Sequence, residues 1–281
     1  MKNSPTIAIL TCWYGDYPWY LPYFIKSCTY NPSIDFIIIT ENLTTIPNKP
    51  SNVIIIYKSF DEFKNNANSK LGFRVALNTP YKLNDFKPAY GFLFPEIFSQ
   101  YDFWGHADID MVYGNIRGFM TDKLLQNYDI LTSREDFIMG TFCLFRNNQQ
   151  MNTLFMKSRD YKHILMNDEY FSFDECNFLF EELGLGYSIL DYPNNLQSMT
   201  YLAKKGNKEG SFKAFFDRLI VQGMSNKIRW DNGLIIYDDK FECLFYDMID
   251  YKVKCKNKNT SFNTIPDIFY FNENGINKNS L

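Results

Sequence analysis

Short apolar runs separated by polar stretches dominate the first part of the chain. Residues 6–13 (TIAILTCW), 34–40 (IDFIIIT) and 53–57 (VIIIY) are nearly continuous and rich in isoleucine. Such runs are typical of strands that are covered on both faces of a sheet. Residues 18–30 have helical spacing, with Pro18 placed for the first turn. The pattern therefore predicts an α/β fold with a mostly parallel sheet flanked by helices.

The same criteria predict elements in the rest of the chain. Strands are expected at residues 103–107, 130–132, 141–145, 187–190, 234–237 and 241–246, and helices at residues 86–101, 115–128 and 172–183. A turn is expected at residues 230–233 (WDNG). The sequence shows no internal repeat, low-complexity linker or break in composition. We therefore predict a single domain over residues 1–281, with an elaboration towards the C-terminus.

Composition and charge limit the class of protein. The chain has 281 residues, of which 46% are hydrophobic, and this is enough to bury a sizeable core. It carries 29 basic and 32 acidic residues, for a formal net charge of −3. This balance lacks the basic footprint of a nucleic-acid-binding protein. None of the six cysteines belongs to a C-x-x-C pair, which argues against a zinc knuckle.

The ends of the chain indicate a cellular setting. The N-terminus has no signal-peptide pattern, and the first apolar run is too short to cross a membrane. A reduced, cytoplasmic setting is therefore expected. Near the C-terminus, residues 252–258 contain four lysines. The simplest interpretation is a solvated edge, and the alternative is a weak peripheral contact with the anionic inner surface of a membrane.

The most informative stretch is YDFWGHADIDMVYGNI, residues 101–116, in which an apolar strand leads into Asp108-Ile109-Asp110. In an extended chain, residues i and i+2 point the same way, so the two carboxylates are expected to converge at the strand end. Two like charges this close favour a cation between them. Mg²⁺ and Mn²⁺ prefer oxygen ligands and combine one or two carboxylates with phosphate oxygens. The competing interpretation is an ordinary aspartate-rich turn.

This stretch resembles the metal-binding D-x-D motif of GT-A-fold glycosyltransferases, and most closely that of bacterial enzymes that build surface polysaccharides. In those enzymes an aromatic strand runs into D-x-D and then into a glycine-containing turn, here Tyr113-Gly114-Asn115. The resemblance extends from residue 6 to about residue 246, and a few short motifs carry it. It implies that Asp108 faces the donor ribose or the metal and that Asp110 binds the metal directly. We expect His106 to be a packed wall residue rather than a ligand.

The same resemblance implies a donor pocket at the end of the first strand. Thr11, Trp13, Tyr14 and Gly15 lie there. Gly15 allows a close approach of the backbone, and an aromatic face can stack on a base. The alternative is a strand-end turn flanked by core aromatic residues. Related enzymes carry a polar residue and a cation before the D-x-D strand, and the residues that match here are Asp85 and Lys87, with Arg74 as a weaker candidate.

On the acceptor side, Gly140 and Thr141 begin a strand like the one that borders the sugar and the acceptor in GT-A enzymes. Inverting members place a general base where Asp174 and Glu175 stand here. Ser172 with Glu175 three residues later is also a capping-box signature. We expect Asp174 to act as the base while Glu175 caps a helix. The resemblance thus implies a donor-binding half, about residues 1–135, and an acceptor-side half, about residues 136–281.

The expected activity is a metal-dependent glycosyl transfer from a nucleotide sugar, by default a UDP-sugar, to a glycan or lipid-linked acceptor in bacterial surface polysaccharide synthesis. Many GT-A enzymes have a histidine metal ligand near the last strand, where this chain has Asp247; either that carboxylate or a water would replace it. Two alternatives remain open. A nucleotidyltransferase would usually show a glycine-rich, basic phosphate loop, and TCWYGDY lacks one. A non-catalytic carbohydrate-binding protein could keep the fold without turnover.

Overall fold

The computed structural model describes residues 4–193, 196–223, 227–256 and 264–278, and within them the fold is mixed α/β, as predicted. The largest sheet has the strand order β3-β2-β1-β4-β7-β6-β8. Strands β3, β2, β1 and β4 are parallel, and β7 is antiparallel to both of its neighbours. The strands of this sheet are β1 (Ile7–Cys12), β2 (Ile34–Thr40), β3 (Val53–Tyr57), β4 (Phe103–Ala107), β6 (Ile130–Thr132), β7 (Phe142–Arg146) and β8 (Ala214–Phe216).

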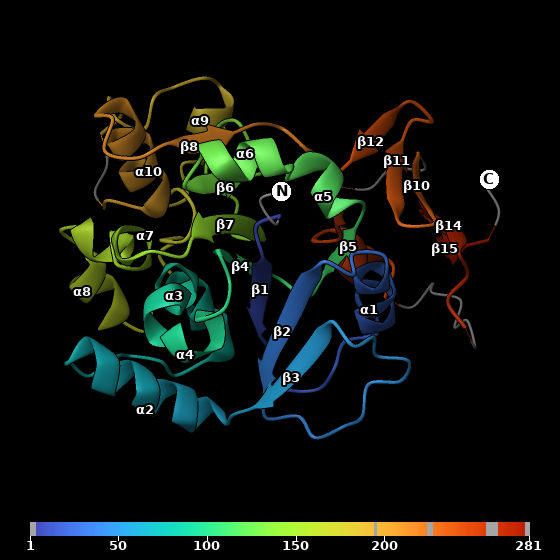
Figure 1. Cartoon of the computed structure of the whole chain (residues 1–281), viewed down its shortest axis with the longest axis horizontal. Helices are drawn as coiled ribbons and strands as arrows, with labels where there is room; N and C mark the ends of the chain where they lie inside the picture. The colour runs from blue at the N-terminus through green and yellow to red at the C-terminus, as the bar shows by residue number, and fades with distance from the viewer. Residues whose placement is uncertain (1–3, 194–195, 224–226, 257–263, 279–281) are drawn as a thin grey trace.

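Two smaller sheets come mostly from the C-terminal third of the chain (Figure 1). One is antiparallel, with the order β12-β11-β10-β14-β15, and the other has the order β5-β13-β9. Strand β5 directly follows the D-x-D stretch and pairs with β13, so that Met111 lies opposite Asp247. These strands are β5 (Met111–Tyr113), β9 (Ile220–Gln222), β10 (Ile228–Asp231), β11 (Leu234–Tyr237), β12 (Phe241–Cys243), β13 (Phe245–Asp247), β14 (Ile268–Asn272) and β15 (Gly275–Asn277).

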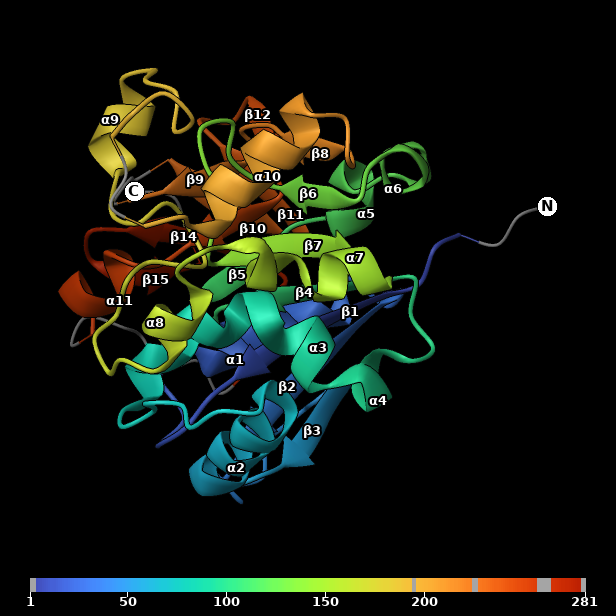
Figure 2. The same ribbon diagram turned by 90° about the vertical axis from the view of Figure 1, so that its left-hand side faces the viewer.

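Helices cover both faces of the large sheet, as Figures 1 and 2 show. None of the helices among the described residues is long and apolar enough to cross a membrane. The longest is α2, which begins with a capping box between Ser59 and Glu62 and ends at the left-handed Gly72. The helices are α1 (Leu21–Thr29), α2 (Phe60–Leu71), η1 (Pro80–Ala89, a 3₁₀ helix), α3 (Tyr90–Leu93), α4 (Pro95–Phe98), α5 (Ile116–Phe119), α6 (Asp122–Asn127), α7 (Gln149–Asn152), η2 (Leu154–Lys157, also 3₁₀), α8 (Tyr161–Leu165), α9 (Phe180–Gly184), α10 (Met199–Lys208) and α11 (Tyr251–Lys254).

Strand β1 separates two hydrophobic cores. Ile7 and Ile9 point into a core shared with α1 and the two smaller sheets, whereas Ala8 and Leu10 point into a core shared with α2, η1, α3 and α10. Successive side chains of a strand alternate between its faces, so a continuous apolar run serves both cores. This burial on both faces explains why the runs at residues 6–13 and 34–40 predicted β1 and β2, whereas β3 lies at the edge of the sheet and is only partly covered.

Several predicted elements differ from the structure. The helix expected at residues 86–101 is split into part of η1, α3 and α4, because Pro88 and Pro95 donate no backbone hydrogen bond. The helix expected at 115–128 is two short helices, and the strand expected at 187–190 is a pair of turns around Ser188. The strand expected at 241–246 is two strands of different sheets. In the expected turn at 230–233, only Asn232 and Gly233 turn, because Trp230 and Asp231 end β10.

The helix predicted at residues 172–183 is also wrong, since only α9 is helical there. Ser172 has a left-handed backbone with φ of +51°, which is incompatible with a helix N-cap. The side chain of Glu175 accepts a hydrogen bond from the amide of Gly140 instead of reaching back to the Ser172 amide. The capping-box signature is therefore present in the sequence without the helix start that it usually marks.

Candidate functional site

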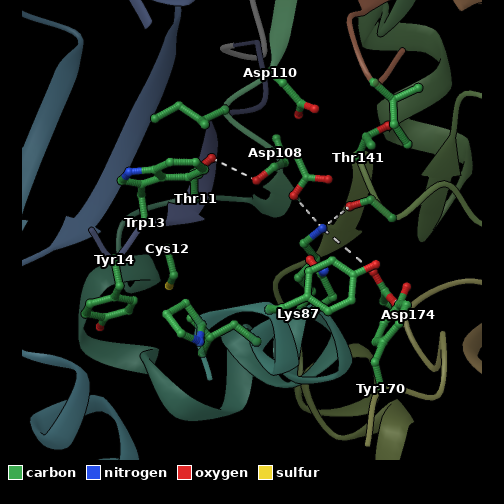
Figure 3. Close-up of a pocket in the computed structure, with 18 of the residues that line it drawn as sticks. Thr11, Cys12, Trp13, Tyr14, Lys87, Asp108, Asp110, Thr141, Tyr170 and Asp174 are labelled. Atoms are coloured by element: carbon green, nitrogen blue, oxygen red, sulfur yellow. Dashed lines mark hydrogen bonds and ion pairs between the residues drawn. The ribbon is translucent and has the colours of Figure 1, made fainter. Parts of the chain in front are cut away.

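A cavity of about 420 Å³ opens at the carboxyl ends of β1 and β4 (Figure 3). Residues from the end of β1, the β4–β5 turn, η1, the start of β7 and the segment before α9 line it. In open α/β sheets, ligands bind outside the carboxyl ends of the strands. The hydroxyl of Thr11 donates a 2.8 Å hydrogen bond to the carbonyl of Ala107, which ties the ends of β1 and β4 together beneath the cavity.

The two aspartates of D-x-D both line the cavity, and each is paired with a different lysine. Lys87 Nζ lies 2.6 Å from Asp108 Oδ1, and Lys252 Nζ lies 2.5 Å from Asp110 Oδ2. Burial raises the pKa of Asp108, and Lys87 only partly opposes this effect. Burial lowers the pKa of Lys252, but the Asp110 carboxylate outweighs it, so that this pKa is raised overall. Each carboxylate is thus held beside a positive charge at the cavity wall.

Lys87 connects Asp108 to the part of the cavity wall formed by Gly140 and Asp174 (Figure 3). Besides contacting Asp108, its ammonium group donates a 2.9 Å hydrogen bond to the carbonyl of Gly140 and lies 3.7 Å from Asp174 Oδ2. Burial lowers the pKa of Lys87, but Asp108 and Asp174 more than offset this, and the pKa is raised. Lys87 is therefore a fixed positive charge between two carboxylates.

The segment that precedes α9 brings both predicted acceptor-side carboxylates to the cavity. Asp174 is 1% exposed, and its Oδ1 accepts a hydrogen bond of 3.3 Å from the hydroxyl of Tyr170. Burial raises the pKa of Asp174 well above its usual range and also raises that of Glu175. Gly140 fits closely beneath them, because a Cβ at this position would lie 2.5 Å from Asp174 Oδ2. Both carboxyl groups therefore hold a proton more tightly than exposed ones.

Asp85 was expected to contact the donor, but it lies below the cavity and does not line it. Its carboxylate accepts hydrogen bonds from the amides of Phe171 and Phe173 and from Lys82 Nζ at 2.8 Å. Both charged side chains are fully buried. Burial raises the pKa of Asp85 and lowers that of Lys82, although each partner opposes the other's shift. Asp85 thus holds in place the segment that carries Asp174.

Asp247 lies next to the aspartate pair but outside the cavity lining. Its Oδ2 accepts a 2.8 Å hydrogen bond from Gln222 Nε2, and its Oδ1 accepts one from the amide of Ile249. Burial, together with the nearby Asp110, raises the pKa of Asp247 to about 7. Within the described ranges, no group of three or more His, Cys, Asp or Glu side chains is arranged to hold a metal ion. Asp247 therefore adds a buried carboxyl group beside the D-x-D pair without lining the cavity.

At the end of β1, Thr11, Trp13 and Tyr14 line the cavity, whereas Gly15, with φ of +109°, lies beyond it. Trp13 is half-buried, and its indole nitrogen donates to the carbonyl of Asp16. The ring of Tyr14 packs edge-on against Phe60 at 5.1 Å and is buried. Trp13 is therefore the aromatic face that is more accessible to a ligand.

The remaining expectations concern Gly140, Thr141, His106 and Arg74. Gly140 and Thr141 line it, and the buried hydroxyl of Thr141 has no hydrogen-bond partner among the described residues. His106 is buried behind the cavity, and its Nδ1 lies 3.1 Å from the carbonyl of Gly140, as expected of a wall residue. Arg74 is exposed and does not line the cavity.

Sequence analysis did not assign Lys252, Tyr170 or Tyr20 to the site, although all three line the cavity. Lys252 was interpreted as part of a basic tail, and no local signal links it to Asp110. Tyr170 stands four residues before Asp174, the predicted base. This spacing brings two side chains together in a helix, but the segment forms a turn here, so the spacing did not indicate the contact between them. Tyr20 precedes α1, and burial raises its pKa, with Asp110 and Asp108 adding to the shift.

The fold and the cavity define an α/β protein with a carboxylate- and lysine-lined site at the carboxyl edge of its main sheet. The family model described as "Family of unknown function (DUF6625)" matches residues 9–277, and the chain belongs to this family. No curated protein matches the chain. Among solved structures, the chain is similar to the galactosyltransferase LgtC in complex with donor and acceptor sugar analogues. The two share 11% identity, with a TM-score of 0.36, over 58% of this chain and 67% of the other.

Proposed function

We propose that the protein transfers a glycosyl group from a nucleotide-sugar donor, by default a UDP-sugar, to an acceptor hydroxyl, with Mg²⁺ or Mn²⁺ held at Asp108 and Asp110. The observation that carries the proposal is the convergence of these two carboxylates, Lys87 and Asp174 on one cavity at the carboxyl edge of the sheet. A cavity of about 420 Å³ is in the size range of small-molecule sites.

The charge of the cavity supports a divalent cation. Four carboxylates line it, those of Asp108, Asp110, Asp174 and Glu175, against two lysines, which leaves an excess of two acidic groups (4 − 2 = 2). A nucleoside diphosphate would add further negative charge, and a divalent cation would offset it. Magnesium binds through one or two carboxylates together with phosphate oxygens and water, so this pair is a sufficient set of protein ligands.

When bound, the cation would supply Lewis-acid stabilisation of the charge that develops on the departing diphosphate. We assign Asp247 to the negative potential around this ion rather than to its direct ligands, because both of its oxygens already accept hydrogen bonds. The residues of the chain itself bind the donor and the acceptor, orient them and move a proton.

Residues of the first half of the chain are assigned to the donor. The exposed face of Trp13 suits a nucleobase, because aromatic faces stack on bases without sequence preference. The ammonium group of Lys87 is fixed by the carbonyl of Gly140 and points at Asp108, where the diphosphate would lie. A preorganised cation at this place stabilises charge in the transition state without reorganisation. This assignment keeps residues 1–135 as the donor-binding half.

Residues of the second half are assigned to the acceptor, which we take to be a glycan or lipid-linked sugar of bacterial surface polysaccharide synthesis. The unpartnered hydroxyl of Thr141 is available to a sugar hydroxyl. Asp174 is the general base, since its carboxylate lines the cavity and burial raises its pKa, which makes it a stronger base than an exposed aspartate. Glu175 holds the amide of Gly140 and so supports the base rather than contacting the acceptor. The cytoplasmic location and the peripheral membrane contact expected from the sequence stay predictions.

The test is nucleoside diphosphate release from a panel of nucleotide sugars with Mn²⁺, Mg²⁺ or EDTA. Release that requires the metal and is lost in Asp110→Asn is expected. Asp217→Asn, an exposed aspartate outside the cavity, is the matched control and should behave like the wild type. Wild-type turnover by Asp110→Asn, with the fold intact by circular dichroism, would refute the assignment. Binding of nucleotide sugars without any turnover would instead support the non-catalytic alternative.

A further inference from the structure

Aromatic side chains form a row that leads out of the cavity. Tyr81 and Tyr170 line the cavity and meet edge-on, with ring centroids 5.0 Å apart. Phe178 lies 5.5 Å from Tyr170, and Phe180 lies 6.5 Å from Phe178. Phe180 rests on the buried Phe137 at 5.2 Å, which anchors the far end. We call Tyr81, Tyr170, Phe178 and Phe180 the aromatic row.

The rings of the row are exposed to an extent that packing alone does not explain. Tyr81 is 66% exposed, Phe178 52% and Phe180 37%. The half-buried Tyr170 links Tyr81 to Phe178, and Phe178 neighbours Phe180, so the exposed rings belong to one connected group rather than to scattered surface positions. Contiguous exposed apolar surface, bordered by polar residues, marks interaction sites on soluble proteins.

The backbone that presents Phe178 is strained. Asn177 and Phe178 both have left-handed conformations, with φ of +54° and +62°. This region is disfavoured for side chains that carry a Cβ, and most of all for bulky ones such as Phe178. The strain turns the Phe178 ring outwards beside Tyr170 rather than into the core. Strained residues of this kind cluster at ligand-binding and catalytic sites.

The row is joined to the chemistry of the cavity through Tyr170. The hydroxyl group of Tyr170 donates a hydrogen bond to Asp174, and its ring contacts that of Phe178. A ligand that presents a hydroxyl to Asp174 would therefore extend directly onto the row. Sugar rings suit such a surface, because their C–H faces pack on aromatic rings while their hydroxyls bond to polar groups at the edges.

The charges beside the row favour a neutral glycan over an anionic lipid surface. Asp168 and Glu169 precede Tyr170, and Glu181 follows Phe180; all three are exposed acids. Such acids accept hydrogen bonds from sugar hydroxyls. They repel the anionic headgroups that attract basic segments to membranes.

We propose that the aromatic row is an acceptor-binding site for an extended oligosaccharide, whose terminal sugar enters the cavity at Asp174 and whose following units lie on Tyr81, Tyr170, Phe178 and Phe180. This proposal rests on the proposed function and names its acceptor as a chain of several sugar units. Each ring of the row then corresponds to about one sugar unit, so the affinity should rise with the first few units and then level off.

The first test is binding, which needs no turnover. Saturation-transfer NMR with malto-, cello- and chito-oligosaccharides of one to six units should show binding to the wild type that strengthens with length in at least one series. In Phe178→Ala the gain from the second to the fourth unit should fall by about tenfold, which corresponds to about 1.4 kcal/mol, because one ring of the row is lost. Phe241→Ala removes an equally exposed phenylalanine from β12, away from the row, and should match the wild type.

The second test compares transfer to long and short acceptors of the same series within each enzyme. The ratio should exceed one in the wild type and in Phe241→Ala and fall towards one in Phe178→Ala. Equal ratios in Phe178→Ala and the wild type, no dependence on length in any series, or tight binding to phosphatidylglycerol vesicles in place of glycans would overturn the proposal. Length-dependent binding without nucleotide release from any donor would keep the aromatic row as a glycan site while the transferase assignment fails.

Discussion

The ammonium group of Lys252 lies 2.5 Å from the carboxylate of Asp110, although the two residues are 142 positions apart in the sequence. The pair places a positive charge at the position where the proposed metal would bind. The Lys252 side chain is 31% exposed and so borders solvent, whereas the Asp110 side chain is 7% exposed.

Replacing Lys252 by methionine should therefore tighten the binding of Mn²⁺ in the absence of donor. The variant leaves the Asp110 carboxylate without a competing ammonium group, so the dissociation constant should fall. Isothermal titration calorimetry with MnCl₂ measures this dissociation constant. Lys254→Met, on the exposed side of the same short helix, serves as the control and should leave the constant unchanged. Weaker manganese binding in Lys252→Met would contradict the competition between lysine and metal.

Stability should depend on pH through Asp247. Its pKa is about 7 in the folded state, against about 3.8 when exposed, so the folded protein retains a proton that the unfolded chain has lost. The corresponding stabilisation is fully present below about pH 4 and is lost as the pH rises through 7, at no more than about 1.4 kcal/mol per pH unit. Asp247→Asn should flatten this part of the profile. Urea unfolding between pH 4 and 8 measures it, and an unchanged slope in the variant would show that Asp247 is not the group responsible.

The buried pair of Lys82 and Asp85 should be strongly coupled. Asp85→Asn leaves the Lys82 ammonium without its counter-charge, which costs about 3–5 kcal/mol for a buried pair. The double variant Lys82→Met with Asp85→Leu should be less destabilised than the single variant, because no charge remains buried. Chemical denaturation of the wild type, the single variant and the double variant compares their free energies of unfolding. If the single change costs less than about 1 kcal/mol, Asp85 does not hold the segment at residues 171–175 in place.

Gly140→Ala should reduce activity by displacing the proposed base. The added Cβ would approach Asp174 Oδ2 to 2.5 Å and Glu175 Cγ to 2.9 Å, so one of the two carboxylates must move. Overpacking of this kind costs about 1–3 kcal/mol of stability. Gly184→Ala is the matched control, because a Cβ there meets no atom within 4 Å. Transfer rates and melting temperatures of both variants test the prediction, and unimpaired transfer by Gly140→Ala would contradict the placement of Asp174.

The sequence predicted the central strands because they are buried on both faces and so appear as continuous apolar runs. The bounds of β2, β3, β4 and β6 agree with the prediction residue for residue. The position of D-x-D followed from the same pattern, since Asp108 stands directly after a strand and therefore at the edge where ligands bind. Lys87 and Asp174 also line the cavity, whereas the helix that Glu175 was expected to cap does not form.

What the sequence did not predict depends on long-range contacts. The segment around Ser172 carries a helix-start signature, but Asp85 binds the amides of Phe171 and Phe173 from 86 and 88 residues away and imposes a different backbone. The pairing of Asp110 with Lys252 and the aromatic row have the same origin. Local patterns report which faces of a segment are buried, and they carry little information about which distant side chain a polar group meets.

The D-x-D turn is held on one side by β4 and on the other by β5, and β5 pairs with residues 245–247. A chain emerging from the ribosome would synthesise Asp108 and Asp110 well before the strand that holds the second side of their turn. The cavity would therefore be completed only after residues 245–252 have been made. Truncated products ending before residue 245 would lack both this strand and Lys252, and we expect translation itself to delay the onset of donor binding.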